Sequence, residues 1–242
     1  MENKTIHILS TRPVNDDIIF EAAAKNIVVD TISFIDTEAI VDSSVLDCID
    51  ELAKQELVVI FTSMNAAEMV IQNLHQQKPA WKIFCMGNST RIIIESHFGN
   101  KAVAAIGNDA TELAKKLVAW RYAAGDSSKV VFFCGDQRRD ELPNYLAQHH
   151  ISVEELVTYK TISQHHVINK DYDAVLFFSP SAVHSFFTTN TSQTSTIYFA
   201  IGNTTANAIK EYTNETISTG AVPSKDELLQ EAIAFFSNKT VN

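Results

Sequence analysis

Short apolar runs and amphipathic segments alternate along most of the chain. The apolar runs are rich in valine, isoleucine and aromatic residues, and most are five to eight residues long, which is typical of strands buried in a sheet. We therefore predict β-strands at Ile6–Ser10, Val28–Ile35, Leu57–Thr62, Lys82–Met86, Ala102–Ile106, Lys129–Cys134, Val153–Thr161, Ala174–Ser179, Thr196–Ile201 and Glu215–Ser218.

The segments between these runs carry apolar residues three and four positions apart, which places them on one face of an α-helix. Ser224 and Glu227 form a capping box at one predicted helix start. Strands that alternate with helices indicate parallel sheets covered on both faces. The predicted helices are Asp16–Lys25, Asn65–His75, Ser89–His97, Ala110–Tyr122, Arg139–His149, Ser181–Thr188, Thr204–Tyr212 and Ser224–Ser237.

The chain also repeats itself. Residues 61–67 (FTSMNAA) resemble residues 177–183 (FFSPSAV), and residues 84–90 (FCMGNST) resemble residues 199–205 (FAIGNTT). The first pair is offset by 116 positions and the second by 115. Two motifs that recur at nearly the same offset indicate two similar domains.

A third, weaker match sets the domain organisation. Residues 8–27 parallel residues 132–151 at an offset of 124 positions, so the N-terminal strand and helix must complete a domain with the C-terminal third of the chain. The chain then crosses twice, near residues 32–35 and 158–163, and two crossing strands make a hinge with a cleft beside it. We predict an α/β protein of two similar, flavodoxin-like parallel-sheet domains joined by a two-stranded hinge, with residues 1–34 and 163–242 in a discontinuous domain and 35–162 in an inserted one.

Composition narrows the classes of function. The net charge of −10 argues against a nucleic-acid partner, which needs clustered lysine and arginine. No apolar run approaches the roughly 20 residues that span a bilayer, and no signal peptide is visible, so we expect a soluble cytoplasmic protein without a membrane partner. The three cysteines are widely spaced and form no metal-binding or redox motif. The chain has only seven glycines, and they form no glycine-rich phosphate-binding loop.

Hydroxyl side chains gather where the predicted strands end. Ligands of parallel α/β sheets bind at these ends, and helix N-termini there offer free N–H groups to carboxylates or phosphates. At any single position, helix capping is the simpler interpretation. Matched placement in both repeats favours ligand binding instead. The residues are Thr62, Ser63, Ser89, Thr90, Ser179, Ser181, Thr204 and Thr205.

Two further side chains are candidates for the site. Arg12 follows the first strand and suits a bidentate carboxylate contact, although a solvated arginine fits the spacing equally well. Tyr159 lies on the second crossing strand, where it either packs or presents its hydroxyl to a ligand. The histidine pairs are adjacent in sequence and point apart, and no metal spacing or nucleophile elbow occurs. These features indicate either a binding module or an enzyme that works mainly by positioning.

Taken in order, the motifs resemble the uroporphyrinogen-III synthase family from about residue 5 to residue 235. Three departures concern caps and packing: Asn26 and His150 lie near positions where the family often has glycine, and Ala67 replaces a larger aliphatic residue. The resembling elements are Phe132-Phe133-Cys134-Gly135 with Arg138, Arg139, Glu141, Leu142, Pro143 and Leu146; residues 177–181 (FFSPS); residues 200–206 (AIGNTTA); residues 61–63; residues 87–90; and residues 157–161 (VTYKT).

The resemblance implies a cyclising hydro-lyase of heme biosynthesis. Such an enzyme closes hydroxymethylbilane, inverts the terminal D pyrrole through a spiro intermediate and releases water, with neither a cofactor nor a metal. It implies that Tyr159 assists loss of the hydroxyl, and that Thr90, Thr205 and the polar residues at 62, 63, 179 and 181 face the cleft.

Partners and alternatives complete these expectations. We expect a monomer that receives its substrate transiently from hydroxymethylbilane synthase. One alternative is a non-catalytic two-domain hinge protein that binds a tetrapyrrole or another anionic ligand, but the chain offers no output domain. The other alternative is an unrelated α/β hydrolase or transferase. The absence of a nucleophile motif and of a phosphate loop from the sequence argues against it.

Overall fold

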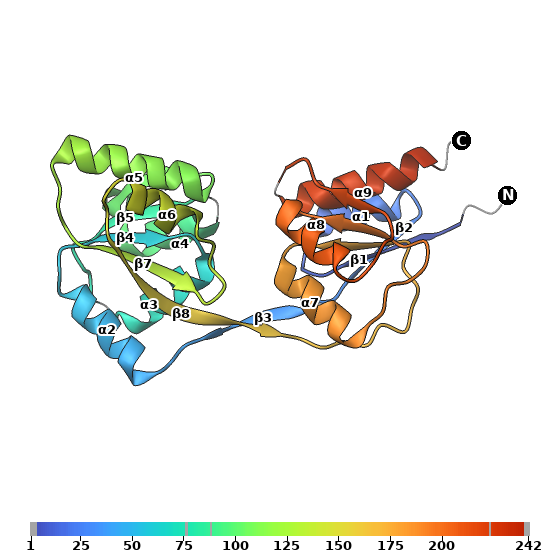
Figure 1. The fold of residues 1–242 in the computed structure, drawn as a ribbon, viewed down its shortest axis with the longest axis horizontal. Helices are drawn as coiled ribbons and strands as arrows, with labels where there is room; N and C mark the ends of the chain where they lie inside the picture. The colour runs from blue at the N-terminus through green and yellow to red at the C-terminus, as the bar shows by residue number, and fades with distance from the viewer. Residues whose placement is uncertain (1–3, 76, 88, 223, 240–242) are drawn as a thin grey trace. The chain divides into compact units, whose positions relative to one another are not determined.

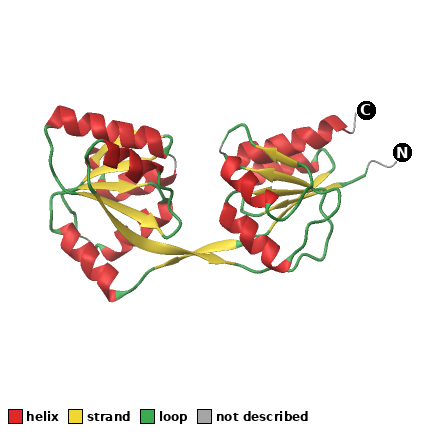
Figure 2. Cartoon of the chain, viewed as in Figure 1, coloured by secondary structure: helices red, strands yellow, loops and turns green. Residues whose placement is uncertain are grey.

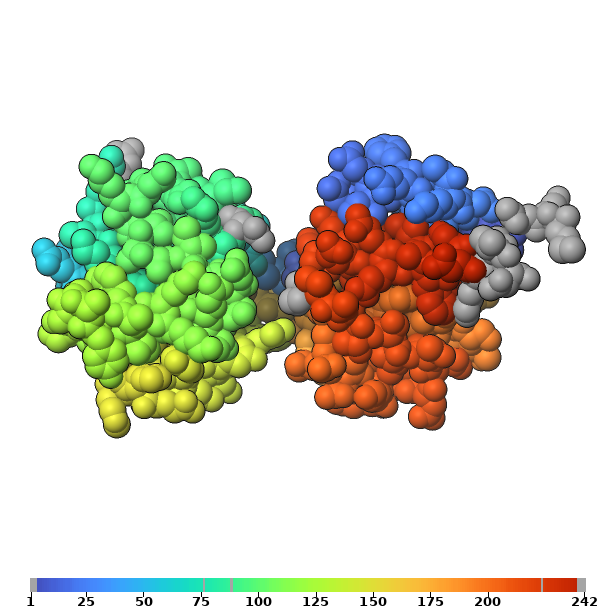
Figure 3. Space-filling view, turned by 90° about the horizontal axis from the view of Figure 1, so that it is seen from above, coloured from blue at the N-terminus to red at the C-terminus, as the bar shows by residue number. Residues whose placement is uncertain are grey.

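A computed structural model describes residues 4–75, 77–87, 89–222 and 224–239 of the protein. Its contacts divide the chain into two compact units. Unit 1 combines Met1–Asp36 with Ile162–Asn242, and unit 2 is Thr37–Thr161. In the space-filling view the blue N-terminal segment lies against the red C-terminal segment, which is how unit 1 comes to be discontinuous (Figure 3). The boundaries predicted from the sequence lie after residues 34 and 162.

Unit 1 is a parallel five-stranded sheet in the order β11-β10-β9-β1-β2. Helices α1 and α9 cover one face of the sheet, and α7 and α8 cover the other (Figures 1 and 2). The apolar side chains of each helix pair are buried in a separate core cluster. Numbered along the chain, the strand order is the flavodoxin-like 2-1-3-4-5. The elements are β1 (Ile6–Ser10), α1 (Asp16–Ala23), β2 (Ile27–Thr31), β9 (Ala174–Phe177), α7 (Pro180–Thr189), β10 (Ile197–Ala200), α8 (Asn203–Lys210), β11 (Ile217–Thr219) and α9 (Lys225–Lys239).

Unit 2 holds a six-stranded sheet in the order β3-β8-β7-β4-β5-β6. Helices α2, α3 and α4 pack on one face, and α5 and α6 on the other. The elements are β3 (Ile35–Ala39), α2 (Ser43–Ala53), β4 (Val58–Phe61), α3 (Met64–Asn73), β5 (Lys82–Met86), α4 (Ser89–Phe98), the 3₁₀ turn Asn100–Ala102, β6 (Val103–Gly107), α5 (Ala110–Ala124), β7 (Val130–Gly135), α6 (Glu141–Gln148) and β8 (Val153–Ser163).

The internal repeat is confirmed by the two sheets. The order β11-β10-β9-β1-β2 in unit 1 corresponds strand by strand to β6-β5-β4-β7-β8 in unit 2. In the third sequence match, β1 therefore corresponds to β7, and β2 corresponds to β8. Asn26 and His150 occupy corresponding places before β2 and β8, and both adopt left-handed backbone, with φ of 58° and 59°.

One prediction for the segment from Val28 to Ala53 was wrong, and one helix within it was not predicted. The predicted strand Val28–Ile35 is two strands, β2 in one sheet and β3 in the other, separated at the fully buried Phe34, which belongs to the core of unit 1. The helix α2 (Ser43–Ala53) was not predicted, although its apolar residues follow a helical spacing and pack into the core of unit 2.

Strands β3 and β8 form the two-stranded connection between the units. They are antiparallel, because the amide of Ile40 donates to the oxygen of Thr158 (2.9 Å) and the amide of Gln164 donates to the oxygen of Phe34 (2.8 Å). The connection therefore has its own ladder of hydrogen bonds. Each of its two strands joins an element of unit 1 to an element of unit 2 along the chain.

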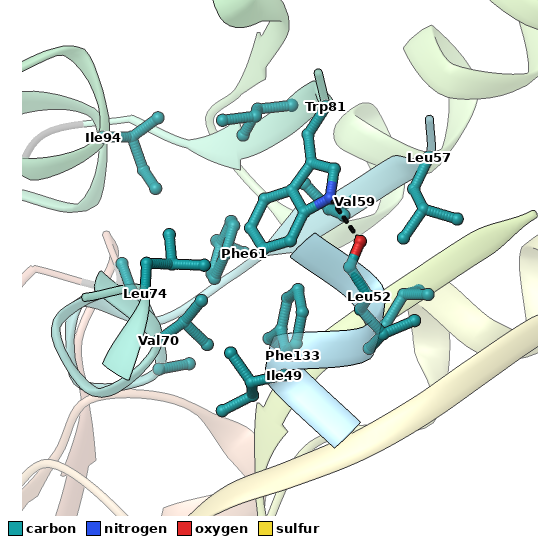
Figure 4. Close-up of a cluster of buried hydrophobic side chains, with 14 of the residues drawn as sticks. Ile49, Leu52, Leu57, Val59, Phe61, Val70, Leu74, Trp81, Ile94 and Phe133 are labelled. Atoms are coloured by element: carbon teal, nitrogen blue, oxygen red, sulfur yellow. Dashed lines mark hydrogen bonds between the residues drawn. The ribbon is translucent and has the colours of Figure 1, made fainter. Parts of the chain in front are cut away.

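One core cluster of unit 2, on the face covered by α2, α3 and α4, contains three aromatic side chains in contact (Figure 4). Phe61 stacks on Phe133 with ring centroids 5.1 Å apart, and Trp81 lies 5.6 Å from Phe133. Trp81 is 3% exposed, and its indole Nε1 donates to the backbone oxygen of Leu52 on α2 (3.1 Å). That bond satisfies the polar end of the indole in an otherwise apolar interior, as buried tryptophan requires.

Candidate functional site

Each sheet has one place where the strand order reverses. In unit 1 it lies between β1 and β9, and in unit 2 between β4 and β7. Ligands of open α/β sheets bind outside the carboxyl ends of the strands at such a switch point. The strands of unit 1 and strands β4 to β8 of unit 2 are parallel, so the loops after them meet at one edge of each sheet. The predicted substrate-binding residues follow β1, β4, β5, β9 and β10.

Two serines of the predicted set cap helices. Ser63 precedes α3, and its Oγ accepts from the amide of Asn65 (3.2 Å). Ser179 precedes α7, and its Oγ accepts from the amide of Ala182 (3.2 Å). Both side chains are half-buried. The capping interpretation therefore holds at these two positions, and each hydroxyl keeps a proton to donate to a ligand.

Two threonines in the first turns of corresponding helices are different. Thr90 in α4 is 4% exposed and Thr205 in α8 is 1% exposed. Neither hydroxyl bonds to any residue that the structure describes, and neither oxygen is fully enclosed by protein. A buried threonine normally spends its hydroxyl on a protein partner. These two hydroxyls remain available beside free amide groups at a helix N-terminus.

The other predicted residues take several positions around these edges. Ser89 and Thr204 are exposed in the first turns of α4 and α8, and Thr62 and Ser181 are half-buried. Ser181 already has an interaction partner. The structure thus groups Thr62, Ser63, Ser89 and Thr90 at the carboxyl edge of the sheet in unit 2. It groups the remaining hydroxyl residues of the predicted set, Ser179, Ser181, Thr204 and Thr205, at the corresponding edge in unit 1.

Arg12 lies at the edge of unit 1, directly after β1. Its backbone oxygen accepts from Ser10 Oγ (2.6 Å), while the preceding Thr11 bonds to the oxygen of Leu176 on β9 through both its amide (3.1 Å) and its hydroxyl (2.7 Å). The loop is therefore fixed at the switch point. The Arg12 side chain is half-buried and has no ion-pair partner among the described residues, so it is available to an anion.

Tyr159 lies on β8 at the carboxyl end of the neighbouring β7, opposite Gly135 in the ladder. Its ring is half-buried and packs against the core cluster on the α2 and α3 side of the sheet. The backbone oxygen accepts from the amide of Asp136 (3.1 Å), and an oxygen of Asp136 accepts from the amide of Thr161 (2.9 Å). The phenol hydroxyl bonds to no residue in the described part of the chain.

The polar face of α3 next to Tyr159 was not predicted from the sequence. A surface pocket within unit 2 is lined by Tyr159 together with Asn65, Glu68 and Gln72 of α3, and with residues of β3. Positions 65, 68 and 72 share one face of a helix, so this polar stripe was visible in the sequence. The Glu68 carboxylate has no partner among the described residues and places a negative charge at the edge of this pocket.

Burial disfavours the thiolate form of the cysteines. Burial raises the pKa of the thiols of Cys85 and Cys134 to about 11, so both remain protonated at neutral pH. Burial also raises the pKa of Cys48. Across the described ranges, no three His, Cys, Asp or Glu side chains cluster as metal ligands, and no helix is long and apolar enough to cross a membrane.

Comparisons with known proteins agree with one another. A family model described as uroporphyrinogen-III synthase HemD matches residues 19–230. The fold is similar to the crystal structure of uroporphyrinogen-III synthetase from Helicobacter pylori, with a TM-score of 0.65 and 14% identity over 95% of this chain and 99% of that one. It is also similar to a mutant uroporphyrinogen III synthase from the bacterium Thermus thermophilus, with a TM-score of 0.56 and 14% identity over 98% of each chain. No curated protein matches the chain by sequence.

Proposed function

The chain belongs to the uroporphyrinogen-III synthase family, and we propose that residues at the carboxyl edges of both its sheets carry out the family reaction. The observation that carries the activity is the family match over residues 19–230. The protein is therefore an enzyme of heme biosynthesis that cyclises hydroxymethylbilane to uroporphyrinogen III. Nothing in the fold or the comparisons favours a non-catalytic ligand-binding protein.

We propose a lyase reaction that begins with loss of water. The bond between the hydroxymethyl carbon and its oxygen breaks, and Tyr159 donates a proton to the departing oxygen. A phenol hydroxyl is a hydrogen-bond donor and can serve as a general acid. The cation that remains is attacked by the substituted carbon of the terminal pyrrole, which gives a spiro intermediate. This intermediate fragments and closes again with the pyrrole inverted, and the ring proton lost at the end restores the tyrosine.

The pocket beside Tyr159 suits this cation. The carboxylate of Glu68, which has no partner among the described residues, attracts positive charge at short range. The side-chain amide oxygens of Asn65 and Gln72 offer acceptors for pyrrole N–H groups. The reaction uses neither a redox step nor a group carrier, so the proposed chemistry needs no cofactor. Its main requirement is a substrate held so that the substituted carbon attacks, and positioning of this kind supplies several kcal/mol.

The substrate's acetate and propionate groups are proposed to bind at the helix starts. The net charge of −10 repels a polyanion at long range, so the affinity must come from donors close to each carboxylate. In unit 2 these donors are Thr62, Ser63, Ser89 and Thr90. In unit 1 they are Arg12, Ser179, Ser181, Thr204 and Thr205. The free hydroxyls of Thr90 and Thr205 support this assignment most strongly, because no protein partner in the described ranges accounts for them.

A Tyr159→Phe variant tests the proposed acid. Hydroxymethylbilane is generated during the assay, the products are oxidised, and the porphyrin isomers are separated by chromatography. We expect the rate of isomer III formation to fall about 100-fold, the usual contribution of general acid catalysis, while spontaneous isomer I accumulates. Full isomer III output from Tyr159→Phe would remove the tyrosine from the mechanism. The monomeric state, the cytoplasmic location and the transfer of substrate from hydroxymethylbilane synthase remain predictions.

A further inference from the structure

The phenol of Tyr159 lies directly against the backbone of Gly135. Strand β7 ends at Gly135, and a bulge in the β7–β8 ladder sets this glycine opposite the tyrosine. A Cβ atom placed on Gly135 would lie 2.4 Å from Cζ, 2.6 Å from Cε2 and 2.7 Å from the hydroxyl oxygen of Tyr159. Ordinary van der Waals contact begins at about 3.4 Å, so no other residue at position 135 leaves the hydroxyl where it is.

We propose that Gly135 is a positioning residue, which sets the location of the Tyr159 hydroxyl for the reaction. The inference rests on the proposed role of Tyr159 as the acid. The body of the ring packs on the core cluster of unit 2, while the oxygen end of the ring lies over Gly135. The hydroxyl has no hydrogen-bond partner in the described part of the chain, so this close approach is what locates it.

Backbone conformation does not explain a glycine at this position. The described glycines with positive φ are Gly99 and Gly125, and Gly135 is not among them. Alanine at position 135 therefore meets no left-handed strain, and its effect comes from the contact with Tyr159 alone. The variant Gly135→Ala must move the phenol oxygen from 2.7 Å to about 3.4 Å from the new methyl group. A displacement near 1 Å costs a positioned catalytic group up to about 100-fold in rate.

The test compares Gly135→Ala, Tyr159→Phe and the double variant, with Gly125→Ala as the control. Gly125 has a φ of 62° and open space around its Cα, so alanine there strains the backbone without touching Tyr159. For Gly135→Ala we expect kcat for isomer III to fall about 10- to 100-fold, with KM within about twofold of the wild-type value. We expect the double variant to be no slower than Tyr159→Phe. Gly125→Ala should lower the melting temperature and keep kcat.

Three results would overturn the inference. The first is wild-type kcat and isomer ratio in Gly135→Ala when Tyr159→Phe is impaired. The second is an equal rate loss from Gly135→Ala with and without the tyrosine hydroxyl, which would indicate general damage to the fold. If Gly135→Ala does not fold, the double variant with Tyr159→Leu removes the ring, and its failure to recover folding would also refute the contact. Wild-type rates in both Gly135→Ala and Tyr159→Phe would instead refute the proposed acid itself.

Discussion

Replacing Thr90 and Thr205 with valine separates a structural role from a binding role. Valine has the shape of threonine but no hydroxyl, and both hydroxyls lack a partner among the described residues. Removing them breaks no hydrogen bond within the described ranges, so the free energy of unfolding should change by less than about 0.5 kcal/mol. If each hydroxyl donates to a substrate carboxylate, its loss costs about 1.5–3 kcal/mol of binding.

The binding cost converts directly into kinetics, because each 1.4 kcal/mol is a factor of about ten. We expect KM for hydroxymethylbilane to rise about 10- to 100-fold in Thr90→Val and in Thr205→Val, with kcat little changed. Thr196→Val is the matched control. Thr196 is 2% exposed, lies before β10 at the amino end of the sheet, and donates to the oxygen of Tyr172 (2.7 Å). Its loss should cost about 1–3 kcal/mol of stability and leave KM unchanged.

Initial rates of isomer III formation against substrate concentration give KM, and thermal denaturation gives stability. Wild-type KM in both valine variants would refute the assignment of these hydroxyls to substrate. A large loss of stability in either variant would show that the hydroxyl has a structural role after all. The control guards against a third explanation, in which any hydroxyl lost from a buried threonine weakens binding by loosening the unit.

Three further predictions concern stability. Ser63→Ala and Ser179→Ala should each lower the free energy of unfolding by about 1 kcal/mol, seen by chemical denaturation, because each removes a helix cap. Burial acts to raise the pKa of Asp30, but hydrogen bonds from Lys170 and a nearby tyrosine lower it overall. A lowered pKa stabilises the folded state above the unfolded value of about 3.9 and is lost as pH falls through the folded value. In calorimetry, the melting temperature of the wild-type protein should exceed that of Asp30→Asn, and this difference should shrink below about pH 4. A difference that stays constant with pH would contradict this reasoning. Trp81→Leu should cost about 2–4 kcal/mol, since it loses both ring packing and the indole hydrogen bond.

The sequence predicts the sheets well because the signals are local and repeated. A buried parallel strand is an apolar run wherever it occurs, and two motifs at nearly the same offset indicate the duplicated topology before any contact is known. The left-handed backbone at Asn26 and His150 was also foreseeable, since both residues occupy sites where helices commonly end in glycine.

The segment around Phe34 shows where such reasoning stops. An apolar run marks burial without saying in which sheet, and here the run crosses from β2 to β3 through a buried phenylalanine. The second strand continues through Asp36, Thr37 and Glu38, which look unlike a strand core. They belong to β3, the edge strand of the sheet, which has a neighbouring strand, β8, on one side only.

The candidate site also has features that the sequence predicts and features that only the structure shows. Serine and threonine at a helix start serve capping and ligand binding equally well, so the sequence places Ser63 and Thr90 in one class. The structure shows that the Ser63 oxygen accepts a hydrogen bond from the amide of Asn65, whereas the Thr90 oxygen has no partner in the described ranges. The approach of Tyr159 to Gly135 depends on a register shift between two strands, which no local pattern reports.

The isomer made by the wild-type protein tests the central claim most directly. Hydroxymethylbilane is supplied by in situ synthesis, the folded protein is added, and the oxidised porphyrins are separated by chromatography. Without a synthase, hydroxymethylbilane closes to isomer I, with no pyrrole inverted. We predict a shift to isomer III that grows with protein concentration. Isomer I alone, from protein shown to be folded by circular dichroism, would contradict the proposed activity and with it the assignment of the strand-end residues to this substrate.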